Sequence, residues 1–187
     1  MVGFVARWLS DALRLGLSIA FAVAALQVPA LTHDYALALA QVAEQGRRDV
    51  DQREAAARQF YHLGADTDEA LVVALRPLEP ANAQALAVSV EGTRALRAAR
   101  DRIEAAPPLP RPVAALAGAL TDADGQERAV LWTALSGFTP EVVIGTASAV
   151  YGLVGLLAGS FAAQALVSLL GSAARRVGRA PGATRSR

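Results

Sequence analysis

Two long stretches without charge, one at each end of the chain, dominate its pattern of hydrophobic and polar positions. The longer covers 33 residues, from Val142 to Ala174. A helix needs roughly 20 predominantly apolar residues to cross about 30 Å of hydrocarbon, so this stretch can span a bilayer. The cap, proline and acid of Thr139–Glu141 suit a helix start, and Arg175–Arg176 suit a headgroup layer. The pattern predicts a transmembrane helix over 142–171.

The other uncharged stretch, Leu15–Leu31, is marginal in length on its own. Extending it toward the N-terminus gives a spanning helix over 8–31. This requires that Asp11 and Arg14, three positions apart, pair with each other or reach the interface. The alternative interpretation is a cleaved signal peptide with Val28–Ala30 as its small-residue site. Cleavage would leave a periplasmic protein anchored only at its C-terminal end, and Pro29 beside the cut counts against it.

Between the two spans the apolar positions recur at helical spacing, and no sustained alternation typical of strands occurs. We expect Thr32 or Asp34 to cap the first helix of this region and Gly64 to end it. The predicted elements are helices over about 32–64, 66–75, 81–106, 113–120 and 124–136, with the proline-rich segment 107–112 as an extended connector. The expected fold class is an all-α membrane protein in which two transmembrane helices, N- and C-terminal, flank a helical extramembrane region over 32–141.

The composition agrees with this fold class and excludes some kinds of functional site. Hydrophobic residues make up 53% of the chain and the mean hydropathy is +0.32, whereas roughly 45–50% apolar residues is usual for a soluble domain. The chain has no cysteine, which excludes disulfides, thiolate metal sites and a cysteine nucleophile.

Charge is distributed unevenly along the chain. The segment before Leu31 carries two Arg and one Asp, the tail after Leu170 carries five Arg and no acid, and the region 32–141 carries 11 Arg and 16 acids. Because basic residues near the ends of spans are retained in the cytoplasm, we expect both termini to be cytoplasmic, with 172–187 as a basic tail. The middle region would then be periplasmic in a multi-pass protein of the bacterial inner (plasma) membrane.

Both predicted spans carry small residues at helical spacing. The stripe in the second span consists of Gly145, Ser148, Gly152, Gly155 and Gly159, and the stripe in the first consists of Gly16, Ala20 and Ala24. Such stripes let helix backbones approach closely in lipid, so we hypothesise that the spans pack on each other through these faces or on copies in an oligomer. We interpret the polar residues Gln27 and Gln164 as interhelical hydrogen-bond partners or interfacial groups.

No constellation of catalytic or ligand residues stands out. His33 and His62 lie 29 positions apart without a metal-motif partner, and the serines of the second span have no local His or acid to activate them. The arginines at 94, 97, 100 and 102 are interleaved with acids, which favours a solvated helix face over a nucleic-acid surface. We therefore predict no catalytic residue, metal, cofactor, small-molecule substrate or nucleic-acid partner, and a protein that is not an enzyme.

Two segments carry a family resemblance. ALQVPALTHDYALAL (25–39) places Gln-x-Pro at the outer end of the first span before a Tyr-bearing helix, and GFTPEVVIGTASAVYGLVGLLAG (137–159) places Phe-x-Pro before a glycine-rich span. This layout, over most of Gly16–Gly171, resembles an uncharacterised bacterial membrane-protein family, the domain of unknown function 2937. The resemblance implies an inner-membrane protein with a helical middle and no assigned catalytic residues, and it favours retention of the first span.

From these features we expect a small inner-membrane protein that presents a helical periplasmic module and acts as a structural or interaction partner, such as an accessory or envelope factor. Its expected partners are the lipid bilayer and either copies of itself or another membrane protein. The alternative is a transport or channel component, in which oligomerised spans would surround a path lined by Gln164, Ser148 and Tyr151. A periplasmic enzyme using helix carboxylates is less favoured, because acid pairs are common on helices.

Overall fold

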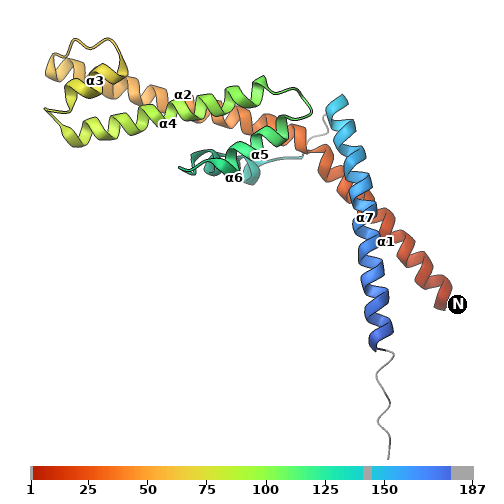
Figure 1. The fold of residues 1–187 in the computed structure, drawn as a ribbon. Coiled ribbons are helices and arrows are strands. Elements are labelled where there is room, and N and C mark those ends of the chain that lie inside the picture. The colour runs from red at the N-terminus through yellow and green to blue at the C-terminus, as the bar shows by residue number, and fades with distance from the viewer. Residues whose placement is uncertain (1, 141–144, 178–187) are drawn as a thin grey trace, which may run out of the picture. The chain divides into compact units, whose positions relative to one another are not determined.

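The computed structural model describes residues 2–140 and 145–177, which are helical with short connections and contain no strand (Figure 1). The predicted all-α fold class is confirmed. The chain divides into two compact units. The terminal unit comprises residues 1–28 and 141–187, and the central unit comprises residues 29–140.

The terminal unit contains α1 (Val2–Leu26) and α7 (Thr146–Val177), which pack against each other. Two helical segments are long and apolar enough to cross a membrane, one within Arg7–Tyr61 near the N-terminus and one over Thr146–Leu169. The prediction of one such helix near each end is confirmed. The predicted start of the second span at Val142 and most of the predicted basic tail lie outside the described residues.

The first helix ends earlier than the predicted boundary at Leu31. Only Gln27 separates α1 from α2 (Val28–Tyr61), and its N–H donates to the carbonyl of Ala24 at 3.2 Å. Pro29 explains this position, because proline has no N–H to continue a helical ladder but is well tolerated in the first turn of a new helix. The helix that follows therefore starts at Val28, so both predicted caps, Thr32 and Asp34, lie inside it and do not cap it.

The central unit is built on two long helices. Its helices after α2 are α3 (Asp68–Leu75), α4 (Pro80–Ala105), α5 (Arg111–Thr121) and α6 (Gln126–Gly137). α2 and α4 lie side by side, with α3 at one end of the pair and α5 and α6 at the other (Figure 1). Two apolar clusters fill these ends. The first contains Tyr35, Ala36, Leu39, Ala43, Leu96, Ala99, Ile103, Ala115 and Val130. The second contains Val50, Ala57, Leu71, Val72, Leu75, Ala83, Leu86 and Val90.

Two helix ends differ from the predicted caps. α2 ends at Tyr61, and His62 rather than Gly64 takes the positive φ of 54°, a conformation that glycine favours but that other residues adopt at some cost. α3 is capped by the hydroxyl of Thr67, which accepts from the N–H of Ala70 at 3.2 Å. α3 therefore starts two residues after the predicted boundary at residue 66.

The proline-rich segment 107–112 is a tight turn, so the prediction of an extended connector is wrong. The N–H of Arg111 donates to the carbonyl of Pro107 at 3.2 Å. Its guanidinium donates to the carbonyls of Ala106 at 2.8 Å and Glu104 at 3.1 Å. These bonds satisfy carbonyls at the end of α4 and fold the chain directly into α5, whose first turn accommodates Pro112.

Candidate functional sites

Glycines of α7 let α1 come unusually close. A methyl group placed on Gly155 would lie 2.5 Å from both the Cβ of Ala25 and the carbonyl oxygen of Phe21. A methyl group on Gly159 would lie 2.8 Å from the Cβ of Phe21. Because carbon atoms in contact lie about 3.5–4.0 Å apart, this approach requires that both positions lack a side chain.

The order of the contacts shows that α1 and α7 are antiparallel. Gly152 lies against Leu26, whereas Gly159 lies against Phe21 and Ser18, so positions ascend along α7 as they descend along α1. The start of α1 and the end of α7 therefore lie at the same end of the pair. The end of α1 and the start of α7 lie at the opposite end of the pair.

The stripe predicted on α7 faces α1 over most of its length. Its buried members are Ser148, Gly152, Gly155 and Gly159. The fully buried Ala163 extends the row, while Gly145 is exposed and has no atom near its missing side chain.

α1 meets α7 through a different row from the predicted one. The predicted row, Gly16, Ala20 and Ala24, is exposed. The row that contacts α7 contains Ser18, Ala22 and Ala25. Both rows carry small residues at helical spacing, so spacing alone could not decide which one faces α7. The hydroxyl oxygen of Ser18, within this row, lies 2.9 Å from that of Ser160 and links the two helices.

The polar residues predicted within the spans do not converge. Ser148 is buried on the side of α7 that faces α1, whereas the side chain of Gln164 is exposed. Gln27 lies at the break between α1 and α2, and its buried Oε1 has no hydrogen-bond partner among the described residues. Ser148 and Gln164 therefore do not line one path along the helix pair.

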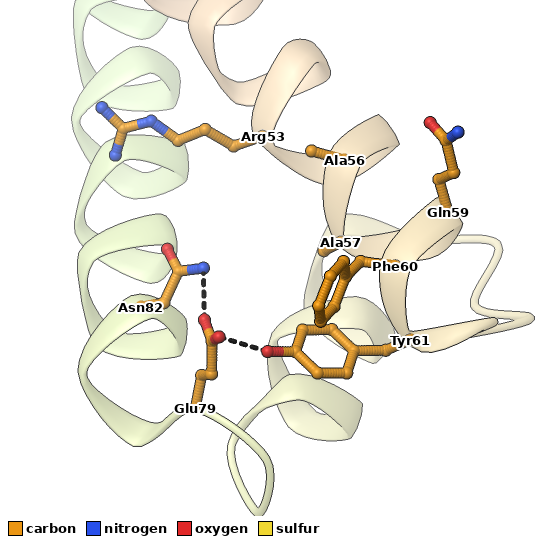
Figure 2. Close-up of a pocket in the computed structure, with 8 residues that line it drawn as sticks. All are labelled: Arg53, Ala56, Ala57, Gln59, Phe60, Tyr61, Glu79 and Asn82. Atoms are coloured by element: carbon orange, nitrogen blue, oxygen red, sulfur yellow. Dashed lines mark hydrogen bonds between the residues drawn. The ribbon is translucent and has the colours of Figure 1, made fainter.

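An open groove in the central unit lies between the end of α2 and the start of α4 (Figure 2). Its volume is about 700 Å³, and it is lined by Arg53, Ala56, Ala57, Gln59, Phe60, Tyr61, Glu79 and Asn82. The Glu79 carboxylate accepts hydrogen bonds from the Tyr61 hydroxyl and from the Asn82 amide, the latter at 2.9 Å. These bonds lower the pKa of Glu79, so the groove presents a stable carboxylate that is poorly suited to donating a proton.

A buried acid of α2 lies beside the ion pair that joins α2 to α3. The side chain of Glu54 is only 2% exposed and pairs with Arg58 at 3.2 Å. Burial, together with the nearby charge of Asp68, raises the pKa of Glu54. Asp68 itself is held by Arg47 at 2.5 Å, and this bond lowers the pKa of Asp68. The Arg47–Asp68 pair thus joins α2 to α3. Beside it, Glu54 is costly to ionise because it is buried.

Further polar ties join α4 and α2 to α6. Arg102 pairs with Glu127 at 2.7 Å, and the buried Tyr35 donates to the carbonyl of Glu127 at 3.2 Å. Burial raises the pKa of Tyr35. Sequence reasoning missed these contacts, because residues so far apart in the chain leave no local pattern.

The remaining chemistry-bearing residues are dispersed. His33 and His62 are exposed, and no group of three or more His, Cys, Asp or Glu side chains that could hold a metal occurs within residues 2–140 and 145–177. The predicted arginine face of α4 carries ion pairs with acids. Arg94 pairs with Glu69 at 2.5 Å and Arg100 with Glu104 at 2.9 Å.

These features define a class of protein: an all-α chain with a long apolar helix near each end and a separate helical unit between them. The family model described as "Protein of unknown function (DUF2937)" matches residues 9–176, and the chain belongs to this family. The predicted family resemblance is thereby confirmed. No curated protein and no solved structure matches the chain significantly.

Proposed function

We propose that this chain is a two-span membrane protein in which α1 and α7 anchor the central unit at a membrane surface, where that unit binds other proteins of the envelope. One observation carries the membrane anchor. The side chains that α1 and α7 direct away from each other are large and apolar, including Trp8 at 64% exposed, Leu153 at 59% and Phe161 at 76%. Burying one such side chain stabilises a protein by about 1.5–3 kcal/mol, so a bilayer is the environment that suits this surface.

The antiparallel helix pair supports a hairpin topology with both termini on one side. The arginine-rich tail and the acidic balance of region 32–141 favour cytoplasmic termini and a periplasmic central unit. The close packing of α1 on the glycines of α7 supports retention of the first span. A cleaved signal peptide would leave this glycine surface without its partner.

A binding role, rather than catalysis, is supported by how the charged side chains of the central unit are used. Its arginines pair mostly with neighbouring acids, and the groove carboxylate of Glu79 is held by two donors. Mild crosslinking in intact cells followed by purification should recover a specific envelope partner. Recovery of the chain alone would contradict the binding role.

The anchor is tested by placing topology reporters at the N-terminus, after Gly64, after Pro107 and after Arg187, together with the intact mass of the purified chain. Cytoplasmic readings at both termini, external readings at the two central sites and an uncleaved mass are expected. A mass corresponding to cleavage near Ala30 would replace the two-span anchor with a single C-terminal one. A cytoplasmic reading at Gly64 would invert the orientation.

A further inference from the structure

Gln164 is a polar residue on the outward surface of α7. It lies five residues after Gly159, roughly 140° around the helix from the glycine that packs on α1, and its side chain is exposed. Ser168 donates to its backbone carbonyl at 2.8 Å. Within residues 2–140 and 145–177 the side-chain amide itself makes no hydrogen bond. Its donors and its acceptor are therefore unused within the described part of the chain.

The surroundings of this amide are apolar. Gln164 belongs to the segment Thr146–Leu169 that can cross a membrane, and the nearby Leu157 and Phe161 are 54% and 76% exposed. Lipid tails offer no hydrogen-bond partner, so an unpaired amide at this depth is unfavourable. A second helix is the usual source of a partner for such a group.

We propose that the face formed by Leu153, Leu157 and Gln164, here called the Gln164 face, binds the same face of a second copy of this chain. The inference rests on the membrane-spanning role proposed above. A second copy fits because an amide is both donor and acceptor, so two Gln164 side chains related by a two-fold axis satisfy each other. Leu157 and Leu153 precede Gln164 by 7 and 11 residues, the spacing of a helix contact stripe. In this dimer the glycine row of α7 stays packed against α1 of the same chain.

The absence of cysteine from the chain gives a direct test. Leu157→Cys leaves Gln164 in place and puts a thiol on the Gln164 face. Ala158→Cys is the matched control, because Ala158 is also exposed, lies at nearly the same depth and points roughly 100° away. Oxidation of membranes containing the full chain should yield a disulfide-linked species of twice the chain mass with Leu157→Cys and little with Ala158→Cys.

The contribution of the amide is measured in the Leu157→Cys background at a series of protein-to-lipid ratios. Gln164→Leu should weaken dimerisation about five- to thirtyfold, the range of an interhelical side-chain hydrogen bond in model peptides. Gln164→Asn retains an amide and should preserve most of the dimer.

Equal crosslinking at residues 157 and 158, no change with Gln164→Leu, or an adduct whose mass differs from two copies would overturn the proposed self-association. Alkaline carbonate extraction of the same membranes separates this outcome from failure of the anchor. A chain released by carbonate overturns both proposals, whereas a retained chain without the Leu157 crosslink overturns only the dimer.

Discussion

At the scale of single residues, Gly155 is where the backbone of α7 comes close to the backbone of α1. The atom that an added methyl group would meet at 2.5 Å is the carbonyl oxygen of Phe21, which cannot turn aside as a flexible side chain can. We expect Gly155→Ala to destabilise the helix pair by about 1–3 kcal/mol, the usual cost of overpacking. Gly16→Ala is the control, since no atom lies within 4 Å of its missing side chain, and it should be neutral or slightly stabilising. Thermal unfolding in detergent, followed by circular dichroism, compares the two, and equal midpoints would contradict the packing.

Glu54 gives the central unit a pH dependence. Its pKa is raised in the folded protein, so the folded state binds this proton more tightly than the unfolded chain does. The stabilisation is therefore present below the ordinary Glu pKa of 4.5 and is lost as the pH rises through the folded pKa. Asp68 has the opposite shift, but above about pH 5 it is ionised in both states and adds little slope.

Glu54→Gln cannot lose this proton, so its melting temperature relative to the natural chain should increase between about pH 5 and pH 8, by a few degrees. Glu44→Gln is the matched control, because the side chain of Glu44 is 54% exposed and surface pairs contribute little. Melting curves of the full chain across this range provide the test. If the difference in melting temperature between Glu54→Gln and the natural chain stays constant with pH, burial does not raise the pKa of this carboxyl.

At the scale of elements, α5 has two faces that are both apolar but differ in burial. Ala115 and Ala119 are 5% and 1% exposed, whereas Val113, Leu116 and Leu120 are 65%, 53% and 70% exposed. We expect Ala119→Asp to cost roughly 3 kcal/mol or more, because it places an uncompensated charge in the core. Leu116→Glu should change the free energy of unfolding by no more than about 0.5 kcal/mol. Thermal unfolding of both variants distinguishes the faces, and a large loss with Leu116→Glu would mean that the outward face is covered.

The elements themselves were largely predictable, whereas their ends and faces were less so. Helical periodicity and the Pro and Gly positions indicate the helices α1 to α7 of the described residues, because these features act within a few residues. The turn at 107–112 was missed because the side chain of Arg111 closes it, and composition alone favours an extended proline segment. The row of α1 that contacts α7 could not be chosen from the sequence, because the rows of Gly16 and Ser18 both consist of small residues. Which row faces α7 is decided by how the two helices pack.

Contacts between distant residues were outside the reach of sequence reasoning. Arg102 and Glu127 are 25 positions apart and looked like two of many surface charges, yet they join α4 to α6 at 2.7 Å. Glu54 looked like an ordinary acid of an amphipathic helix, and its burial depends on α3 folding back over α2. Polar ties of this kind become visible only when the helices are placed in space.

At the scale of the whole molecule, the two units are stabilised in different ways. The terminal unit depends on close helix contact and directs apolar side chains outward, whereas both apolar clusters of the central unit lie entirely on α2 to α6. This separation predicts that a fragment of residues 29–140 folds without α1 and α7. Pro29 can start α2 in that fragment, because the first helical position needs no N–H partner. Circular dichroism should show a helical spectrum with a single cooperative thermal transition.

A shorter fragment, 29–106, tests whether this cooperativity comes from the clusters. It retains all of the second cluster but loses α5 and α6, which contribute Ala115 and Val130 to the first cluster alongside Tyr35 and Leu39. Exposing two large side chains that are fully buried in the intact unit forfeits roughly 1.5–3 kcal/mol each, a large part of the 5–15 kcal/mol by which ordinary domains are stable. The shorter fragment should therefore melt at a lower temperature and more broadly than 29–140. If both fragments melt alike, α5 and α6 do not form part of the core; if neither folds, the central unit depends on its helical anchors.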